Sequence, residues 1–413
     1  MKKLLAAALI CLYLFTLLAC KETKPSITGP DNNNLQPDLE KINAEVVQTN
    51  NDFGLQLFKT INTTCPDSNI FIAPLSVSIA LGMALNGAEG TTRDEIITML
   101  NLGGMSQETI NETYQQLITL LAGNEEKVLF EIANSVWYDQ TRMIPEQDFL
   151  NVNQKFFFAD VLNLNFSQAG AVDSINNWIS DKTHGKIENM LDQIPGSAVL
   201  YLINALYFYG QWLYTFDKEK TEEFDFFLQG GAVVQCPLMN QKSEYYYYEN
   251  EDIQMLDMKY ANEAYSMTLI LPKYDKDINM IIDDLSPETW SDWINLMDKD
   301  SVTVHLPKFK TEYKRTLNED LKALGMKLAF TPDADFSGIA PGREIWISRV
   351  LHKALIEVNE EGSEAAAATI IEFIELSIPM HPEMFINRPF FFVIREHQTN
   401  TILFMGKIMN PVE

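Results

Sequence analysis

The chain has 413 residues, enough for one large domain or for two to three domains of ordinary size. Apolar residues make up 46% of it, so it can bury a sizeable core and is not a disordered polymer. The net charge is −26, from 57 acidic and 31 basic residues, and a surface this acidic repels phosphate backbones and anionic lipids. We therefore expect no nucleic-acid binding. The charge fits either high solubility or the steering of a basic partner.

The first 19 residues have the pattern of a secretory signal. Lys2 and Lys3 precede an apolar run over 4–18, which is interrupted only by Thr16 and closes on Ala19 and Cys20. This junction is similar to the cleavage box of bacterial lipoproteins, although Leu18 departs from the small residue common there. Cys20 would then carry the lipid, which predicts an exported outer-membrane or cell-surface lipoprotein that faces the periplasm or the exterior. An ordinary signal peptide and a short membrane anchor are the alternatives.

The next segment predicts a flexible tether. Residues 20–40 begin with the cysteine to be lipidated, and 21–40 contain three prolines, one glycine and three consecutive asparagines without an apolar period. No second linker follows, so a single domain is expected over 41–413. This domain holds only Cys65 and Cys236, too few for a disulfide framework, and the sequence leaves open whether these two pair.

The domain mixes helical and strand patterns. Residues 44–62 carry apolar side chains at helical spacing, 76–85 are small and apolar like a buried helix, and Thr91–Glu95 begin another helix with capping-type residues. The segments Leu200–Tyr209, Tyr265–Leu271 and Val302–Leu306 are short and rich in β-branched or aromatic residues, which indicates strands. Helices gather early and strands late, so we expect an α+β fold.

Signatures of catalysis are missing from the sequence. It contains no G-x-S-x-G, no phosphate-binding loop, no H-E-x-x-H and no C-x-x-C, and its five histidines are scattered without metal-ligand spacing. We expect no enzyme activity, no cofactor and no metal. A Ser-His-Asp triad assembled from distant residues is the remaining enzymatic alternative.

One segment, 360–376, carries two conflicting patterns. Its four alanines and several glutamates favour a helix that would start at Ser363 and stop before Pro379. Its alternation favours a strand, because one face is uncharged and begins with small residues while the other carries both acids. The uncharged face consists of Ser363, Ala365, Ala367, Thr369, Ile371 and Phe373. A segment that can be loop, helix or strand suits a conformational switch.

Residues 357–369, EVNEEGSEAAAAT, resemble the hinge of the reactive loop in the serpin family, and further motifs follow in family order over nearly the whole domain. They are NIFIAPLS from Asn69, NALYF and GQW around Trp212, LPKF from Leu306, DFSGI from Asp335, HKA from His352, NRPF from Asn387 and LFMGK from Leu403. Each motif alone is weak evidence for the family, but the complete set in this order is specific to it. The resemblance implies three β-sheets, about eight or nine helices and an exposed reactive loop at about 360–386.

The resemblance also implies a mechanism, in which a serine protease cuts the loop and remains attached as an acyl-enzyme. The severed loop then enters the largest sheet as a new central strand and disables the protease. The partner is therefore expected to be a serine protease, bound covalently by a monomeric inhibitor. The implied hinge comprises Glu360, Gly362, Ser363, Ala365, Ala366, Ala367, Ala368 and Thr369, and its small uncharged residues mark inhibitory members.

The family's usual spacing from Glu360 places the reactive bond between Leu376 and Ser377. A leucine before the bond suits chymotrypsin-like or some elastase-like enzymes. Met380 and His381 lengthen the loop slightly beyond the common pattern, so Ile374, Glu375 and Met380 remain alternatives for the residue before the bond.

Further positions match the polar shutter beneath the sheet opening (Ser76, Asn204, His352) and the breach where insertion begins (Trp212). Ala73 replaces a hydroxyl residue that is usual in the shutter of the family. Two rival functions remain: inhibition of cysteine proteases, and a non-inhibitory binding role.

Overall fold

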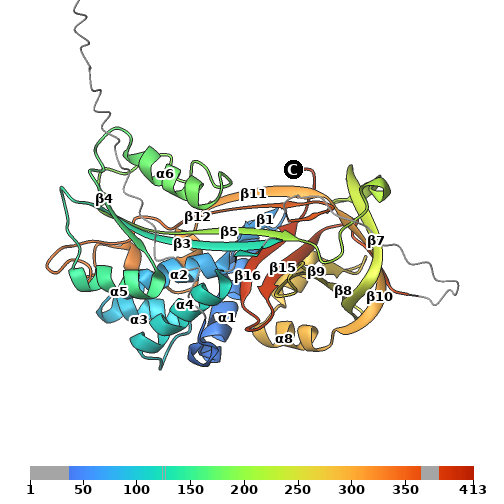
Figure 1. Ribbon diagram of the computed structural model, residues 1–413, viewed down its shortest axis with the longest axis horizontal. Coiled ribbons are helices and arrows are strands. Elements are labelled where there is room, and N and C mark those ends of the chain that lie inside the picture. The colour runs from blue at the N-terminus through green and yellow to red at the C-terminus, as the bar shows by residue number, and fades with distance from the viewer. Residues whose placement is uncertain (1–36, 123, 126, 364–380) are drawn as a thin grey trace, which may run out of the picture.

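The computed structural model describes residues 37–122, 124–125, 127–363 and 381–413. Within these ranges it holds nine α-helices and three β-sheets, as predicted for the α+β fold (Figure 1). The helices are α1 (Ala44–Thr64), α2 (Pro74–Leu85), α3 (Gly90–Met99), α4 (Gln107–Leu121), α5 (Gln147–Phe157), α6 (Ala171–Lys182), α7 (Ile278–Asp283), α8 (Pro287–Asn295) and α9 (Asn318–Ala323).

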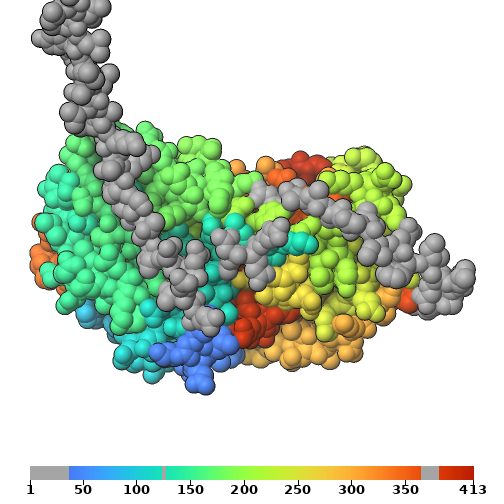
Figure 2. Space-filling model, viewed as in Figure 1, coloured from blue at the N-terminus to red at the C-terminus, as the bar shows by residue number. Residues whose placement is uncertain are grey.

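The largest sheet has nine strands and contains the two strands nearest the C-terminus. Its order is β1 (Ile70–Ile72), β16 (Ile402–Ile408), β15 (Phe390–Glu396), β9 (Tyr265–Pro272), β8 (Ile253–Lys259), β7 (Val233–Glu249), β10 (Asp298–Pro307) and β14 (Glu383–Phe385), with β6 (Glu222–Phe227) beside β7. Every residue of β9, β15 and β16 is buried, because helices and the other sheets cover both faces. In Figure 2 the residues coloured blue to green, from the first half of the chain, lie mostly on one side of the molecule, and those coloured yellow to red lie mostly on the other.

The other two sheets lie side by side and form the upper layer in Figure 1. A five-stranded sheet has the order β13 (Gly362–Ser363), β5 (Leu200–Gln211), β3 (Val128–Asp139) and β2 (Asn124–Glu125), with β4 (Asp160–Leu164) parallel to β3. A two-stranded sheet pairs β11 (Phe309–Thr316) with β12 (Leu351–Val358). Helix α6 contacts β3 and β5, and α2 contacts β5 from the other side, so this layer is covered on both faces.

Local sequence explains most helices and strands. The Asn43 side chain caps α1 by accepting from the backbone N–H groups of Glu45 and Val46, and α2 is buried on nearly all sides, as its small apolar residues predict. The predicted strands lie within β5, β9 and β10.

The cap predicted for the third helix is wrong: α3 begins at Gly90, after Glu89, and no side chain caps it. Helices and strands also alternate more than expected, since α7, α8 and α9 come late in the chain.

The two cysteines of the domain are free thiols. Cys65 follows α1 and is half-buried, whereas Cys236 is buried in β7. The core therefore holds this fold together without a disulfide among the described residues.

Candidate functional site

The site begins where the hinge joins the end of β5. Gly362 and Ser363 form strand β13, which pairs antiparallel with Gln211 and Gly210. The adjoining backbone continues this contact, because the N–H of Trp212 donates to the carbonyl of Glu361 at 2.9 Å and the N–H of Phe216 donates to that of Glu360 at 2.8 Å. The hinge residues described here are thus in a strand and not in the helix that local propensity favours.

A tight turn carries the chain from β12 into the hinge. The Asn359 side chain accepts from the backbone N–H groups of Glu361 at 3.0 Å and Gly362 at 3.3 Å, and the N–H of Asn359 donates to the carbonyl of Gly362. The indole of Trp212 donates to the carbonyl of Asn359 at 3.0 Å. Trp212 therefore fixes the point from which the hinge departs, the position expected for the breach.

Two glutamates anchor the turn through lysines. The buried carboxylate of Glu360 accepts from Lys308 and from the Thr221 hydroxyl, both at about 2.9 Å, and Glu361 pairs with Lys218 at 2.5 Å. Burial alone would raise the pKa of Glu360, but the hydrogen bonds from Lys308, its own backbone and Thr221 outweigh burial, so its pKa is lowered. Glu360 thus stays ionised and bound at neutral pH.

Close packing surrounds the first two hinge residues. A Cβ at Gly362 would lie 2.0 Å from the carbonyl oxygen of Gly210 and 2.7 Å from the Cα of Gln211, so only glycine permits this approach. The Ser363 hydroxyl lies 2.9 Å from that of Tyr260, whose ring stacks on Trp212 with centroids 4.8 Å apart. The Ser363 side chain therefore points into the core beneath the sheet.

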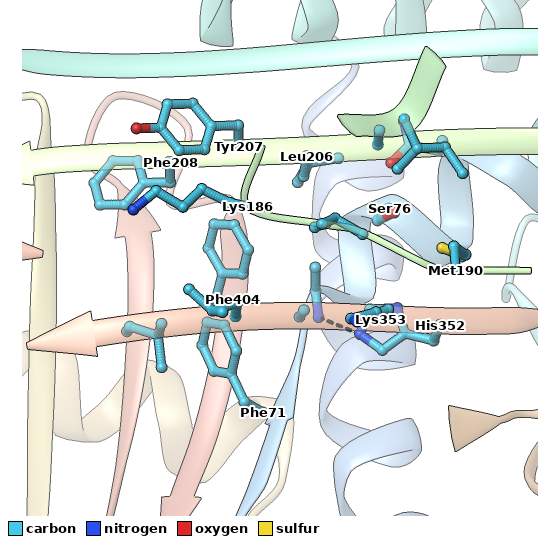
Figure 3. A pocket seen from close by; sticks show the side chains of 18 of the residues that line it. Phe71, Ser76, Lys186, Met190, Leu206, Tyr207, Phe208, His352, Lys353 and Phe404 are labelled. Carbon is cyan, nitrogen blue, oxygen red and sulfur yellow. Dashed lines mark hydrogen bonds between the residues drawn. The ribbon is translucent and has the colours of Figure 1, made fainter. Parts of the chain in front are cut away.

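Beyond Ser363, β5 and β12 face each other across an opening. In the described parts of the chain, only β13 pairs with the β12-facing edge of β5, and β12 pairs only with β11. A small cavity of about 50 Å³ lies between residues 204–208 of β5 and 351–357 of β12 (Figure 3). A larger cavity of about 480 Å³ shares part of its lining. The family resemblance implied entry into the largest sheet. Among the described residues the hinge joins the five-stranded sheet, next to the two-stranded one, and the entry of the severed loop stays a prediction.

Ser76, Asn204 and His352 all line both cavities, so the structure gathers the three expected shutter residues. No hydrogen bond joins any two of them among the described residues. Asn204 instead donates to Asn134 at 2.7 Å, and its own buried carbonyl oxygen has no partner there. Nε2 of His352 accepts from the backbone N–H of Ala73 at 3.2 Å (Figure 3). A backbone group therefore contacts the imidazole at the position where the usual hydroxyl residue is missing.

Burial lowers the pKa of His352 to about 4. Because this pKa lies below the usual 6.5 of histidine, the unfolded chain binds the proton more readily. We expect the free energy of unfolding to fall by about 3 kcal/mol as pH drops from about 6.5 to about 4. Urea unfolding of wild type and His352→Gln at pH 7 and pH 4.2 measures this effect. The variant should lose less stability on acidification, and an equal loss in both proteins would contradict the assignment.

The remaining predicted site residues lie outside the described residues. They are the hinge alanines Ala365, Ala366, Ala367 and Ala368, Thr369, the bond at Leu376 and Ser377, its alternatives Ile374, Glu375 and Met380, and the lipidation residue Cys20. The chain is described again from His381 and enters β14, which runs parallel to β10. The two flanks of the loop thus belong to different sheets.

Sequence reasoning missed five side-chain partners of the hinge and its turn: Lys308, Lys218, Thr221, Asn359 and Tyr260. Lys308 and Asn359 fall inside motifs that the sequence analysis quoted, so their motif membership was a usable signal. Lys218, Thr221 and Tyr260 carry no such signal, because only the folded chain brings them to the hinge.

The sequence model of the family described as "Serpin (serine protease inhibitor)" matches residues 48–411. The chain is a serpin. Human neuroserpin is 33% identical over 371 residues, which cover 87% of this chain and 90% of neuroserpin. Iripin-8 of Ixodes ricinus is 34% identical over 389 residues, which cover 90% of this chain and 95% of iripin-8. Serpins are generally inhibitors of serine proteases and mostly not enzymes themselves.

Solved serpins confirm the fold. The thermophilic serpin tengpin in its native state aligns with a TM-score of 0.81 and 34% identity, covering 89% of this chain and 95% of tengpin. Human thyroxine-binding globulin, solved with thyroxine, aligns with a TM-score of 0.82 and 30% identity, covering 89% and 99%. Among the described helices of this serpin, none is both long and apolar enough to cross a membrane.

Proposed function

We propose that this serpin traps serine proteases covalently, through cleavage of its loop between Leu376 and Ser377. The protease nucleophile attacks the carbonyl carbon of Leu376, the bond to the nitrogen of Ser377 breaks, and the departing amine takes a proton. The acylated loop then enters the opening between β5 and β12 before water releases the protease. The pairing of Gly362 and Ser363 with the end of β5, whose edge has no other strand partner among the described residues, carries this proposal.

Continuing that register predicts which residues would meet on insertion. Since Gly362 faces Gln211 and Ser363 faces Gly210, each further step pairs one loop residue with one earlier residue of β5. Directly opposed side chains in an antiparallel pair point to the same face, so every second residue after Ser363 would point into the core. The core-facing pairs would be Ala365 with Phe208, Ala367 with Leu206, Thr369 with Asn204, Ile371 with Leu202 and Phe373 with Leu200.

This register supports insertion energetically. The small alanines need little room beside Phe208 and Leu206, so the first part of the strand can enter easily. Thr369 would bring a hydroxyl to Asn204, whose buried carbonyl oxygen lacks a partner among the described residues. Ile371 and Phe373 would then each contribute roughly 1.5–3 kcal/mol on full burial. The starting state would accordingly be kinetically trapped above the inserted one.

The reactive bond determines the target class. Leucine before the bond fits apolar specificity pockets, so we propose chymotrypsin-like or elastase-like targets. Mixing the full chain with such proteases and running a denaturing gel tests the proposal, because a trapped protease migrates at the summed mass. Loop cleavage without this band would instead favour a non-inhibitory binding role, as the likeness to a serpin solved with thyroxine illustrates. Complexes with cysteine proteases alone would favour the cross-class alternative.

Exchanging Leu376 for arginine is expected to redirect the inhibitor. Trypsin-like pockets prefer a basic residue, so Leu376→Arg should trap trypsin at least tenfold faster and chymotrypsin at least tenfold slower than wild type. Association rates from progress curves measure both changes. Glu375→Arg serves as the matched control, and if it moves the preference while Leu376→Arg does not, the bond lies elsewhere.

We further propose export and lipid anchoring of this serpin at the outer membrane or cell surface. The pattern of residues 1–19, Cys20 and the tether up to residue 40 supports this proposal. Mass spectrometry of the mature N-terminus should find an acylated Cys20. A Cys20→Ser chain should leave the membrane fraction, whereas cleavage at another residue would support an ordinary signal peptide.

A further inference from the structure

The lining of the large cavity is mostly apolar but also includes several charged side chains. Its volume of about 480 Å³ falls in the range of small-molecule sites, and most of its lining is apolar, from α2, β5 and the segment 336–352. Its charged lining comprises three arginines and one glutamate: Arg142, Arg343, Arg349 and Glu344. In a chain with a net charge of −26, this excess of positive charge favours an anionic occupant.

Two of the arginines are held at one end of the cavity. Arg142 donates to the carbonyls of Gly196 at 2.7 Å and Ala198 at 2.9 Å, and Arg349 donates through one terminal nitrogen to the carbonyl of Gln193 at 2.5 Å. Both therefore hold the same segment, 193–198, which leads into the cavity wall at Ser197. This arrangement keeps two guanidinium groups in place without a carboxylate partner in any ion pair described for them.

Polar atoms at this end need a partner. Nε of Arg349 and the hydroxyl oxygen of Tyr201 are both buried without a hydrogen bond in the described structure, and both residues line the cavity. Burial raises the pKa of Tyr201, and hydrogen bonding and charge from the neighbouring Arg349 oppose that rise, so the two side chains lie close together although neither of these two atoms has a well-formed hydrogen bond. A carboxylate could accept from both, since guanidinium and hydroxyl groups are donors that carboxylates match.

We propose that this cavity binds a fatty acid, with the carboxylate at Arg349 and Tyr201 and the alkyl chain against α2 and β5. Leu200 and Leu202, which line the cavity, are the residues that would face Phe373 and Ile371 after insertion. A bound fatty acid would therefore block the second half of loop insertion and convert the trap into a cleaved substrate. This regulatory step rests on the proposed function, whereas binding itself does not.

Equilibrium dialysis of the full chain with radiolabelled dodecanoate, below its micelle concentration, tests the binding. We expect one dodecanoate per chain, with affinity falling roughly fourfold for each methylene removed from the probe. Dodecanol and butyrate, which lack the charge or the chain, should bind at least tenfold more weakly. Absence of saturable binding, or equal binding of dodecanol, would overturn the proposal.

Substitutions in the cavity test whether dodecanoate binds there and not at another surface of the protein. Arg349→Gln and Ala80→Phe, which remove the charge or fill the space, should each weaken dodecanoate binding at least tenfold. Lys310→Gln makes the same charge change on exposed β11 and should bind normally. If Arg349→Gln fails to fold, dodecanoate binding by Arg343→Gln and Ala80→Phe is measured instead. Normal binding by both variants would contradict the proposed binding site.

The regulatory step has its own readout. Adding dodecanoate to a chymotrypsin-like protease and the wild-type chain should raise the ratio of cleaved inhibitor to covalent complex at least threefold, with no change in Ala80→Phe. Dodecanoate binding without any covalent complex would refute the proposed function and leave the binding site standing. Covalent complex without dodecanoate binding would refute the site alone.

Discussion

Replacing Gly362 with alanine is expected to turn this serpin from a trap into a substrate. The added methyl group would lie 2.0 Å from the carbonyl oxygen of Gly210, a backbone atom that cannot swing aside. Overpacking of this kind costs about 1–3 kcal/mol and would displace the docked hinge from β5, so the severed loop would insert roughly 5- to 160-fold more slowly. If insertion slows that much, hydrolysis of the acyl-enzyme wins the competition and free protease returns.

A denaturing gel and the stoichiometry of inhibition measure this change. Gly362→Ala should give little covalent complex and at least tenfold more cleaved inhibitor per inactivated protease than wild type. Gly103→Ala is the matched control, because a Cβ there meets no atom within 4 Å. Normal trapping by Gly362→Ala would show that the contact of the hinge with β5 does not control insertion.

Placing an arginine at Thr369 should abolish trapping and also the heat resistance that follows cleavage. The register proposed above puts this residue opposite Asn204, in the buried region that His352 also lines. An unpaired buried charge costs several kcal/mol, so insertion would stop before Ile371 and Phe373 reach the core. The protease would still cut the loop, since the reactive bond itself is unchanged.

Calorimetry before and after cleavage at Leu376 tests this expectation. Wild type should show a rise in Tm of tens of degrees on cleavage, because insertion releases the energy of a kinetically trapped state. Thr369→Arg should show almost none. Glu364→Arg carries the same new charge on the opposite face of the strand and should retain most of the rise. A full rise in Thr369→Arg would refute the register.

Much of the fold could be predicted from the sequence, because its signals are local or follow the order of family motifs. The helix over 44–62 and the strand over Leu200–Tyr209 show clear periodicity, and α1 and β5 contain them. At the hinge the sequence carried conflicting helix and strand patterns, and the described residues Gly362 and Ser363 form a strand. Tertiary contact with β5 explains this outcome, since the hinge gains backbone partners there that a short isolated helix lacks.

The parts that could not be predicted depend on distant segments meeting. Nothing in the sequence indicates that β5 and β12 stand apart, or that His352 accepts from the backbone of Ala73, 279 positions away. The cap of α3 failed for another reason: threonines and an aspartate near a helix start suggested capping, but Glu89 occupies the N-cap without a side-chain bond. Composition near a boundary does not determine which residue adopts the cap conformation.

The position of β16 constrains how the molecule is made. This strand, near the end of the chain, lies between β15 and β1, and β1 begins at Ile70. A nascent chain that has not reached residue 402 therefore lacks the strand that pairs with β1 among the described residues, and one edge of β15 is exposed. The nine-stranded sheet can close only after residues 402–408 have been made, so the strands synthesised earlier must be kept from aggregating until then.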